Sequence, residues 1–229
     1  GTPYIYQGEE LGMTNVFFDS VDDYNDLEIH DSWRKYVVES QRVSPEDMLR
    51  YISASGRDNA RTPMQWDASE NAGFTTGTPW LKVNPRYTDI NAAEELANDD
   101  SIFYHYSDLI HLRKEHPIVL TGEYRVLNLE DEQVYAYLRV NSAEDAAASG
   151  ERALLVVANF TQETLSLPYA DGQLASLALK NPGVLKIEEL AAMGEAPELI
   201  SSNYRNEHGE FTDEGTTLRP YEAKVYLYR

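Results

Sequence analysis

The sequence contains no cysteine and few basic residues, and both shortages limit its functions. Without cysteine, neither a disulfide framework nor a thiolate metal site can form. The 19 lysines and arginines are outnumbered by 39 aspartates and glutamates, which gives a net charge of −20. Such an excess of negative charge disfavours binding to nucleic acid or to anionic membranes, because phosphate groups attract lysine and arginine.

The sequence also lacks an apolar run long enough to cross a bilayer, and no segment resembles a signal peptide. These absences predict a cytoplasmic protein without a membrane partner. The first residue is Gly1 rather than methionine, and the residues that follow it read like the interior of a domain. We therefore expect a piece of a longer protein, whose targeting segment, if any, would lie outside this sequence.

A polar and aromatic loop, GRDNARTPMQWD at residues 56–67, is the most informative segment. Loops rich in Arg, Asp and Trp are common binding sites on rigid scaffolds. A sugar site needs planar donors and acceptors for hydroxyl groups, and Arg57 and Arg61 supply such donors. The alternative is a buried Arg–Asp network that only fixes the loop, and composition alone does not separate the two.

In the first half of the chain, spacing and capping predict one strand and four helices. Residues 1–6 are apolar and aromatic, which predicts a buried strand. The predicted helices cover residues 31–40, 44–56 (Ser44 as N-cap and Pro45 at the first position), 91–98 and 101–116. The last helix should bury one face, because apolar residues recur every three or four positions: Phe103, Tyr106, Leu109, Ile110 and Leu112.

Beyond Pro117 the helical pattern gives way to alternation, which predicts strands. The strand over residues 153–158 is apolar on both faces and should be central, whereas residues 141–150 should form an exposed loop. The other predicted strands are 124–129, 134–140, 165–167, 184–190 and 224–228. These elements predict an all-β sandwich over residues 119–229, with the domain boundary close to residues 117–121.

Several long motifs occur in the same order as in the α-amylase superfamily, which the chain closely resembles. Within it, the chain is most similar to the oligo-1,6-glucosidase and dextran glucosidase branch. The motifs are GTPYIYQGEELGMTN (1–15), the loop at 56–67, NAGFTTG (71–77), VNP (83–85), DSIFY (100–104) and LRPYEA (218–223). The resemblance implies an α/β plus all-β fold: residues 1–118 are the last βα unit of a (β/α)₈ TIM barrel with active-site rim loops. An antiparallel β-sandwich follows at 119–229.

The resemblance also implies which residues bind substrate. Arg57 matches the family arginine that hydrogen-bonds the non-reducing-end glucose, and Glu28 matches a glutamate that contacts the sugar on the leaving side. The family's nucleophile, acid and transition-state carboxylate all precede the Gly-Thr-Pro run, so no catalytic residue is assigned and the chain alone is expected to be inactive. The missing N-terminal barrel portion is therefore an expected partner. No cofactor and no metal site are expected.

The function implied is that of a retaining, exo-acting glycoside hydrolase, an α-glucosidase that releases glucose from α-1,6-linked isomalto-oligosaccharides. Alternatives are a trehalose-6-phosphate hydrolase, a sucrose isomerase of the same superfamily, or a non-catalytic interaction module. A phosphorylated substrate would require a basic patch on the leaving side, for which the candidates are Arg34, Lys35 and Arg42.

Overall fold

The computed structural model describes residues 2–127, 131–168, 197–204 and 215–229. The chain divides into two compact units, one over residues 2–107 and one over residues 108–229. Helix α4 (Ile102–Glu115) crosses the division between them. The domain boundary near residue 118 stays a prediction.

The first unit is built around two helices, α1 (Leu27–Trp33) and α2 (Pro45–Ser55). The last residue of α1 leads directly into a π-helix, η3 (Arg34–Glu39). For α2 the predicted signals are confirmed: the Ser44 hydroxyl accepts a hydrogen bond from the Asp47 N–H at 3.1 Å, Pro45 is the first helical residue, and Gly56 ends the helix. The helix predicted over residues 31–40 is present but starts earlier, because Asp26 caps α1.

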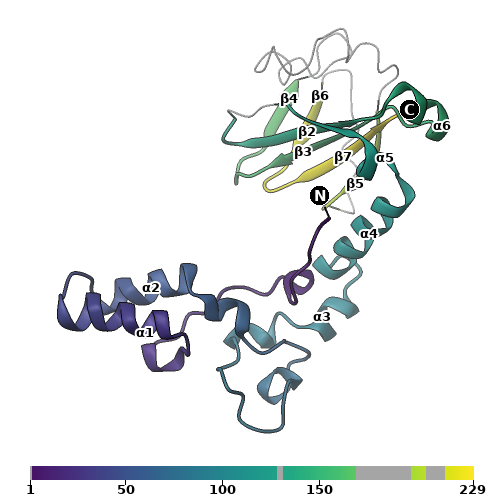
Figure 1. The fold of residues 1–229 in the computed structure, drawn as a ribbon. Helices are drawn as coiled ribbons and strands as arrows, with labels where there is room; N and C mark the ends of the chain where they lie inside the picture. The colour runs from purple at the N-terminus through teal and green to yellow at the C-terminus, as the bar shows by residue number, and fades with distance from the viewer. Residues whose placement is uncertain (1, 128–130, 169–196, 205–214) are drawn as a thin grey trace. The chain divides into compact units, whose positions relative to one another are not determined.

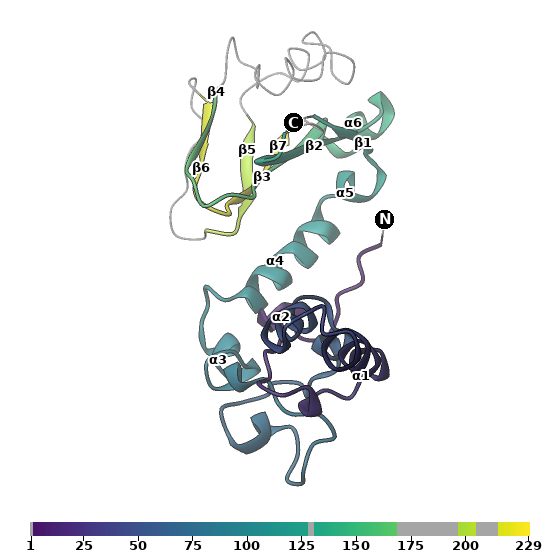
Figure 2. The same ribbon diagram turned by 90° about the vertical axis from the view of Figure 1, so that its left-hand side faces the viewer.

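Helices α1 and α2 lie side by side in both views (Figure 1 and Figure 2). On each helix, apolar residues one helical turn apart face the other helix, and their contacts hold the pair together. The core of this unit consists of Val16, Phe18, Tyr24, Ile29, Met48, Ile52 and Leu81.

The rest of the first unit is a set of short helical turns joined by loops. They are η1 (Glu9–Leu11), η2 (Val21–Asp23), η4 (Arg57–Arg61), η5 (Glu70–Gly73), η6 (Pro85–Thr88) and α3 (Ala92–Ala97). The predicted N-cap of α3 is confirmed, because the Asn91 side chain accepts a hydrogen bond from the Glu94 N–H at 3.0 Å.

Two predictions for this half of the chain are wrong. Residues 2–6 form no strand, and Tyr4 is 93% exposed. A strand needs a neighbour for its ladder of hydrogen bonds, and no other described segment pairs with these residues. The predicted apolar face of α4 is not buried either. No residue of α4 is fully buried, and Ile110 is 42% exposed.

The second unit contains two antiparallel sheets, as the sequence predicted (Figure 1). The larger sheet has the order β1 (Glu123–Val126), β2 (Val134–Val140), β3 (Ala153–Asn159), β7 (Ala223–Tyr228) and β5 (Glu198–Ser202). The smaller pairs β4 (Leu165–Pro168) with β6 (Gly215–Leu218). The central place of β3 is confirmed, whereas β5 and β6 were not predicted and the strand predicted over residues 184–190 lies outside the described residues.

Residues 141–150, predicted to be an exposed loop, contain helix α6 (Ala143–Ser149). Its start is fixed by Ser142, whose hydroxyl accepts a hydrogen bond from the Asp145 N–H at 3.1 Å, and it ends at Gly150 with a φ of 74°. This capping pattern and the helix propensity of the alanines that follow it make a short helix more stable than a loop here.

The sandwich core lies between the two sheets. Residues of both contribute, among them Leu138 and Leu155 of the larger sheet and Leu218 of the smaller one. The opposite face of the larger sheet packs Leu154 and Leu227 against Ile118 of the short helix α5 (Ile118–Thr121). The fold class expected for this half, an antiparallel β-sandwich, is therefore confirmed.

Candidate functional site

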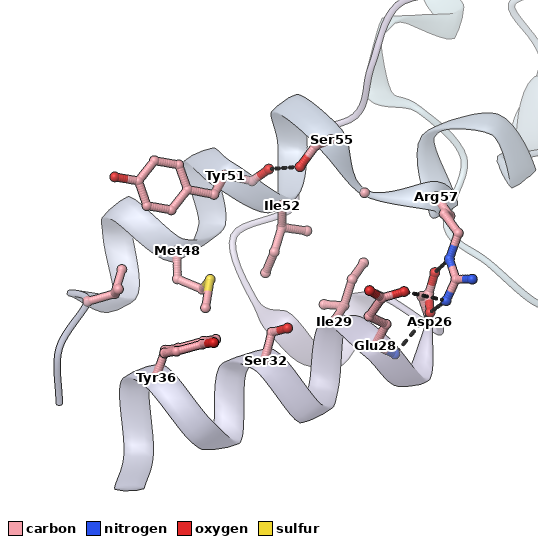
Figure 3. A pocket seen from close by; sticks show the side chains of 12 residues that line it. Asp26, Glu28, Ile29, Ser32, Tyr36, Met48, Tyr51, Ile52, Ser55 and Arg57 are labelled. Carbon is pink, nitrogen blue, oxygen red and sulfur yellow. Dashed lines mark hydrogen bonds and ion pairs between the residues drawn. The ribbon is translucent and has the colours of Figure 1, made fainter. Parts of the chain in front are cut away.

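The structure brings the two predicted binding residues together at one end of the α1–α2 pair (Figure 3). Arg57 is the first residue of η4, directly after the Gly56 that ends α2. Glu28 is in the first turn of α1. Their side chains form an ion pair with 3.0 Å between Arg57 Nη2 and Glu28 Oε2. The contact joins residues that are far apart in the sequence, so both belong to one site.

Asp26, which the sequence analysis did not assign, is the residue that orients Arg57. Its two carboxylate oxygens accept hydrogen bonds from Nε and Nη2 of Arg57, both at 2.6 Å. One of them also caps α1 by accepting the Glu28 N–H at 3.0 Å. An aspartate just before a helix is a recognisable N-cap signal, but nothing in the sequence shows that the same carboxylate reaches an arginine on another helix.

A second arginine and a second buried aspartate complete the network. Arg61 Nη1 lies 3.2 Å from Asp26 Oδ2 and 3.2 Å from Asp58 Oδ1. The other oxygen of Asp58 accepts backbone N–H groups from Asn25 at 2.7 Å and from Asp26 at 3.0 Å. The loop at residues 56–67 thus contains the Arg–Asp network that was the alternative to a binding site. This network does not exclude a binding role, because the Arg57 side chain that takes part in it is still exposed.

The electrostatics of the site follow from unequal burial. The Asp26 side chain is 3% exposed, whereas those of Arg57 and Glu28 are 58% and 76% exposed. The hydrogen bonds from Arg57 lower the pKa of Asp26 to about 2. The same bonds raise the pKa of Arg57. Asp26 therefore stays ionised and holds Arg57 from the buried side, whereas the other side of the charged guanidinium is exposed.

A pocket of about 570 Å³ extends from this charged cluster along the groove between the helices (Figure 3). Its volume is within the usual range for small-molecule sites. The first helix and η3 contribute Ile29, Ser32 and Tyr36, and the second contributes Met48, Tyr51, Ile52 and Ser55. The charged residues lie at one end of the pocket, and the walls are mostly apolar.

The arrangement is suited to a ligand with hydroxyl groups. No described residue accepts a hydrogen bond from Nη1 of Arg57, so this donor is available, and the exposed Glu28 carboxylate is an acceptor. Within the described residues, no group of three or more histidine, aspartate or glutamate side chains could hold a metal ion. None of the helices in the described part of the chain is long and apolar enough to span a bilayer.

Comparison with known sequences gives one family. The catalytic domain of alpha amylase matches residues 1–122. An oligo-1,6-glucosidase of Halalkalibacterium halodurans is 43% identical over 228 residues, which is 99% of this chain and 35% of that protein. A trehalose-6-phosphate hydrolase of Bacillus subtilis is 41% identical over 99% of this chain and 35% of its own length. The chain spans about a third of the length of the curated relatives it matches.

Solved structures agree with the sequence comparison. Trehalose-6-phosphate hydrolase of Bacillus licheniformis matches all of this chain and 36% of its own, with a TM-score of 0.80 and 38% identity. Trehalulose synthase of Pseudomonas mesoacidophila matches the same shares with a TM-score of 0.77 and 36% identity. These matches confirm the predicted resemblance and fold class, in which part of a TIM barrel precedes a β-sandwich. The chain belongs to the α-amylase family.

Proposed function

We propose that this chain is part of a retaining, exo-acting glycoside hydrolase that releases glucose from α-1,6-linked isomalto-oligosaccharides. Relatives named oligo-1,6-glucosidase, at 41–43% identity, support this activity. The nucleophile, the general acid and the third carboxylate would be supplied by the part of the barrel that this chain does not span. The reaction would be a double displacement through a covalent glucosyl-enzyme, without a cofactor. We also propose a cytoplasmic location.

The observation that carries the proposal is the way Arg57 is held. Asp26 fixes two of its nitrogens, and Nη1 has no acceptor among the described residues. A guanidinium held in one orientation can hydrogen-bond a particular sugar hydroxyl at a small cost in side-chain entropy. We assign this donor to the non-reducing-end glucose, at the hydroxyl opposite the scissile bond. A chain end would fit there and a longer chain would collide, which is why we propose exo-action.

Glu28 would bind the sugar on the leaving side. Its carboxylate is exposed and lies 3.0 Å from Arg57 Nη2, so it is close to the proposed glucose site. A carboxylate can accept hydrogen bonds from two neighbouring hydroxyl groups. We therefore propose that Glu28 contributes to the preference for α-1,6 over α-1,4 linkages.

Charge favours this substrate over a phosphorylated one. The cluster contains three carboxylates (Asp26, Glu28 and Asp58) and two guanidiniums (Arg57 and Arg61), so its net charge is −1. A phosphate dianion would be repelled by such a cluster. Of the predicted basic patch, Arg34 pairs with Asp31 at 3.0 Å. A trehalose-6-phosphate hydrolase or a sucrose isomerase remains the second candidate, since one solved relative is a trehalose-6-phosphate hydrolase and another is an isomaltulose synthase in complex with its natural substrate sucrose.

The experiment is steady-state kinetics on the full-length protein that contains this chain, with isomaltose, maltose, sucrose and trehalose 6-phosphate. For Arg57→Ala we expect kcat/KM on isomaltose to fall about 30- to 900-fold, the equivalent of about 2–4 kcal/mol for a charged hydrogen bond in a binding site. Arg50→Ala is the matched control, because Arg50 forms only exposed ion pairs on α2. For Glu28→Gln we expect a lower isomaltose-to-maltose ratio.

Three outcomes would contradict the proposal. An unchanged kcat/KM in Arg57→Ala would remove its binding role. A preference for trehalose 6-phosphate, or conversion of sucrose into an isomer, would favour the second candidate. No turnover of any of the four sugars would favour a non-catalytic module.

A further inference from the structure

We propose that Asp58 is a positioning residue for linkage specificity, because it fixes the spacing between the Arg57 donor and the Glu28 acceptor. The inference rests on the proposed function and deepens it: it concerns how the same site distinguishes α-1,6 from α-1,4 linkages. The Asp58 side chain is 0% exposed, so it acts through its neighbours and not by contact with the substrate.

The two carboxylate oxygens of Asp58 hold different groups. Oδ2 accepts the backbone N–H groups of Asn25 at 2.7 Å and of Asp26 at 3.0 Å, which are the residues just before α1. Oδ1 accepts a hydrogen bond from Arg61 Nη1 at 3.2 Å. Asp58 directly follows Arg57 in η4. Its carboxylate therefore ties the backbone next to the donor to the backbone from which the helix of the acceptor begins.

The hydrogen bonds between Arg57 and Asp26 do not fix this spacing by themselves. An arginine side chain is long and flexible, so its guanidinium can follow a carboxylate that moves. The side chain of Asp58 is short and holds main-chain groups, so a shift of the helix start would break hydrogen bonds at a buried carboxylate, which is costly. Glu28 is the second residue of α1, so its place depends on where the helix starts.

A site that selects one linkage has to control the distance between its groups for the two sugars. Under the proposed function, Arg57 binds the non-reducing-end glucose and Glu28 binds the sugar on the leaving side. An α-1,6 bond places an exocyclic methylene group between the rings, so the second ring lies elsewhere than in an α-1,4 disaccharide. Misplacing a binding group by about 1 Å can cost about 100-fold in rate. The carboxylate that holds the spacing therefore influences which linkage is preferred.

The test is steady-state kinetics of Asp58→Asn in the full-length protein that contains this chain, with isomaltose and maltose. Asparagine has a single acceptor oxygen, so it cannot serve both the backbone N–H groups and Arg61. We expect kcat/KM to fall about 10- to 100-fold on isomaltose and much less on maltose, so that the isomaltose-to-maltose ratio falls. An unchanged ratio would overturn the inference.

A double-mutant cycle shows whether Asp58 acts through Glu28. Glu28→Gln alone should lower the ratio, and in that background Asp58→Asn should lower it no further. If the two effects on the ratio multiply instead, Asp58 acts independently of Glu28 and the inference is wrong.

Asn59 provides the matched control, because it anchors the same helical turn to other segments. Its Oδ1 accepts the Val16 N–H at 3.0 Å, and its Nδ2 donates to the Ser53 carbonyl at 2.8 Å. Asn59→Ala should lower stability without moving α1, and the ratio should stay unchanged. An equal fall of the ratio in Asp58→Asn and Asn59→Ala would leave Asp58 with a role in stability only.

Hydrogen exchange tests the positioning contact without any substrate. The Asn25 and Asp26 amides should exchange faster in Asp58→Asn than in wild type, and at the wild-type rate in Asn59→Ala. Unchanged exchange of these amides in Asp58→Asn would refute the contact. If Asp58→Asn does not fold, Arg61→Gln, at a side chain that is 41% exposed, removes the charge next to Oδ1 and should lower the ratio by a smaller factor.

Failure of the inference can be told from failure of the proposed function. If Arg57→Ala lowers kcat/KM but Asp58→Asn leaves the ratio unchanged, only the positioning role fails. If Arg57→Ala leaves kcat/KM unchanged, the proposed function fails and the specificity role of Asp58 fails with it.

Discussion

Replacing Asp26 by asparagine should destabilise the first unit in a pH-dependent way. Asparagine keeps the volume and an oxygen that can cap α1, but it removes the charge that Arg57 and Arg61 share. The carboxyl pKa is lowered from 3.8 to about 2, and each pKa unit corresponds to about 1.4 kcal/mol. This gives about 2 kcal/mol, which we reduce to about 1–2 kcal/mol because water surrounds the half-exposed Arg57.

The pH dependence has a definite direction. A carboxyl group whose pKa is lower in the folded state stabilises the fold above its unfolded pKa, and this contribution is lost as pH falls through the folded pKa. The difference in unfolding free energy between wild type and Asp26→Asn should therefore be full at pH 5–7. It should shrink between about pH 4 and pH 2, where wild-type Asp26 becomes protonated.

The assay is urea unfolding followed by tryptophan fluorescence. All three tryptophans of the chain lie within residues 2–107, so their signal reports the first unit alone. The matched control is Asp31→Asn on the same helix, where Asp31 pairs with Arg34 at 3.0 Å but both side chains are mostly exposed. Its effect should stay below about 0.5 kcal/mol. Equal effects of the two substitutions at pH 7, or an Asp26→Asn effect independent of pH, would refute the reasoning.

Two further predictions concern other parts of the chain. Glu222 is 1% exposed and lies 3.7 Å from the buried Lys224 Nζ, so Glu222→Gln should destabilise the second unit by about 3–5 kcal/mol. Hydrogen exchange of the β7 amides would measure this, and exposed Glu198→Gln should have little effect. Gly73 has a φ of 65°, and an added Cβ would lie 2.7 Å from a carboxylate oxygen. Gly73→Ala should therefore cost about 1–3 kcal/mol by the same fluorescence assay, and Gly77→Ala, where the nearest atom is at 3.7 Å, should cost much less.

Elements with strong local signals could be predicted from the sequence. Helix α2 has a serine cap, a proline at its first position and a glycine at its end, and the structure has all three where the sequence placed them. Strand β2 (Val134–Val140) has alternating burial along much of its length and was predicted with the same bounds. In both cases the information lies within a dozen consecutive residues.

Two of the wrong predictions share a different physical cause. The apolar face of α4 needs another element to pack against, and the strand at residues 2–6 needs another strand to pair with. The sequence of such a segment indicates that a partner would be favourable, but not whether one is present. Periodicity predicted which residues of α4 are on one face, but their burial depends on what packs against them. The described residues leave that face partly exposed.

The candidate site shows the same limit at the level of single residues. Arg57 and Glu28 were predicted from motif resemblance, and the structure joins them. Asp26 was not predicted, although it has the more constrained role. The sequence position of Asp26 indicates a helix cap, and one carboxylate oxygen does cap α1. The second oxygen accepts a hydrogen bond from Arg57, and only the packing of α2 on α1 brings that arginine within reach. The residue that orients a binding side chain is thus harder to predict than the side chain itself, because its function exists only in the folded arrangement of two helices.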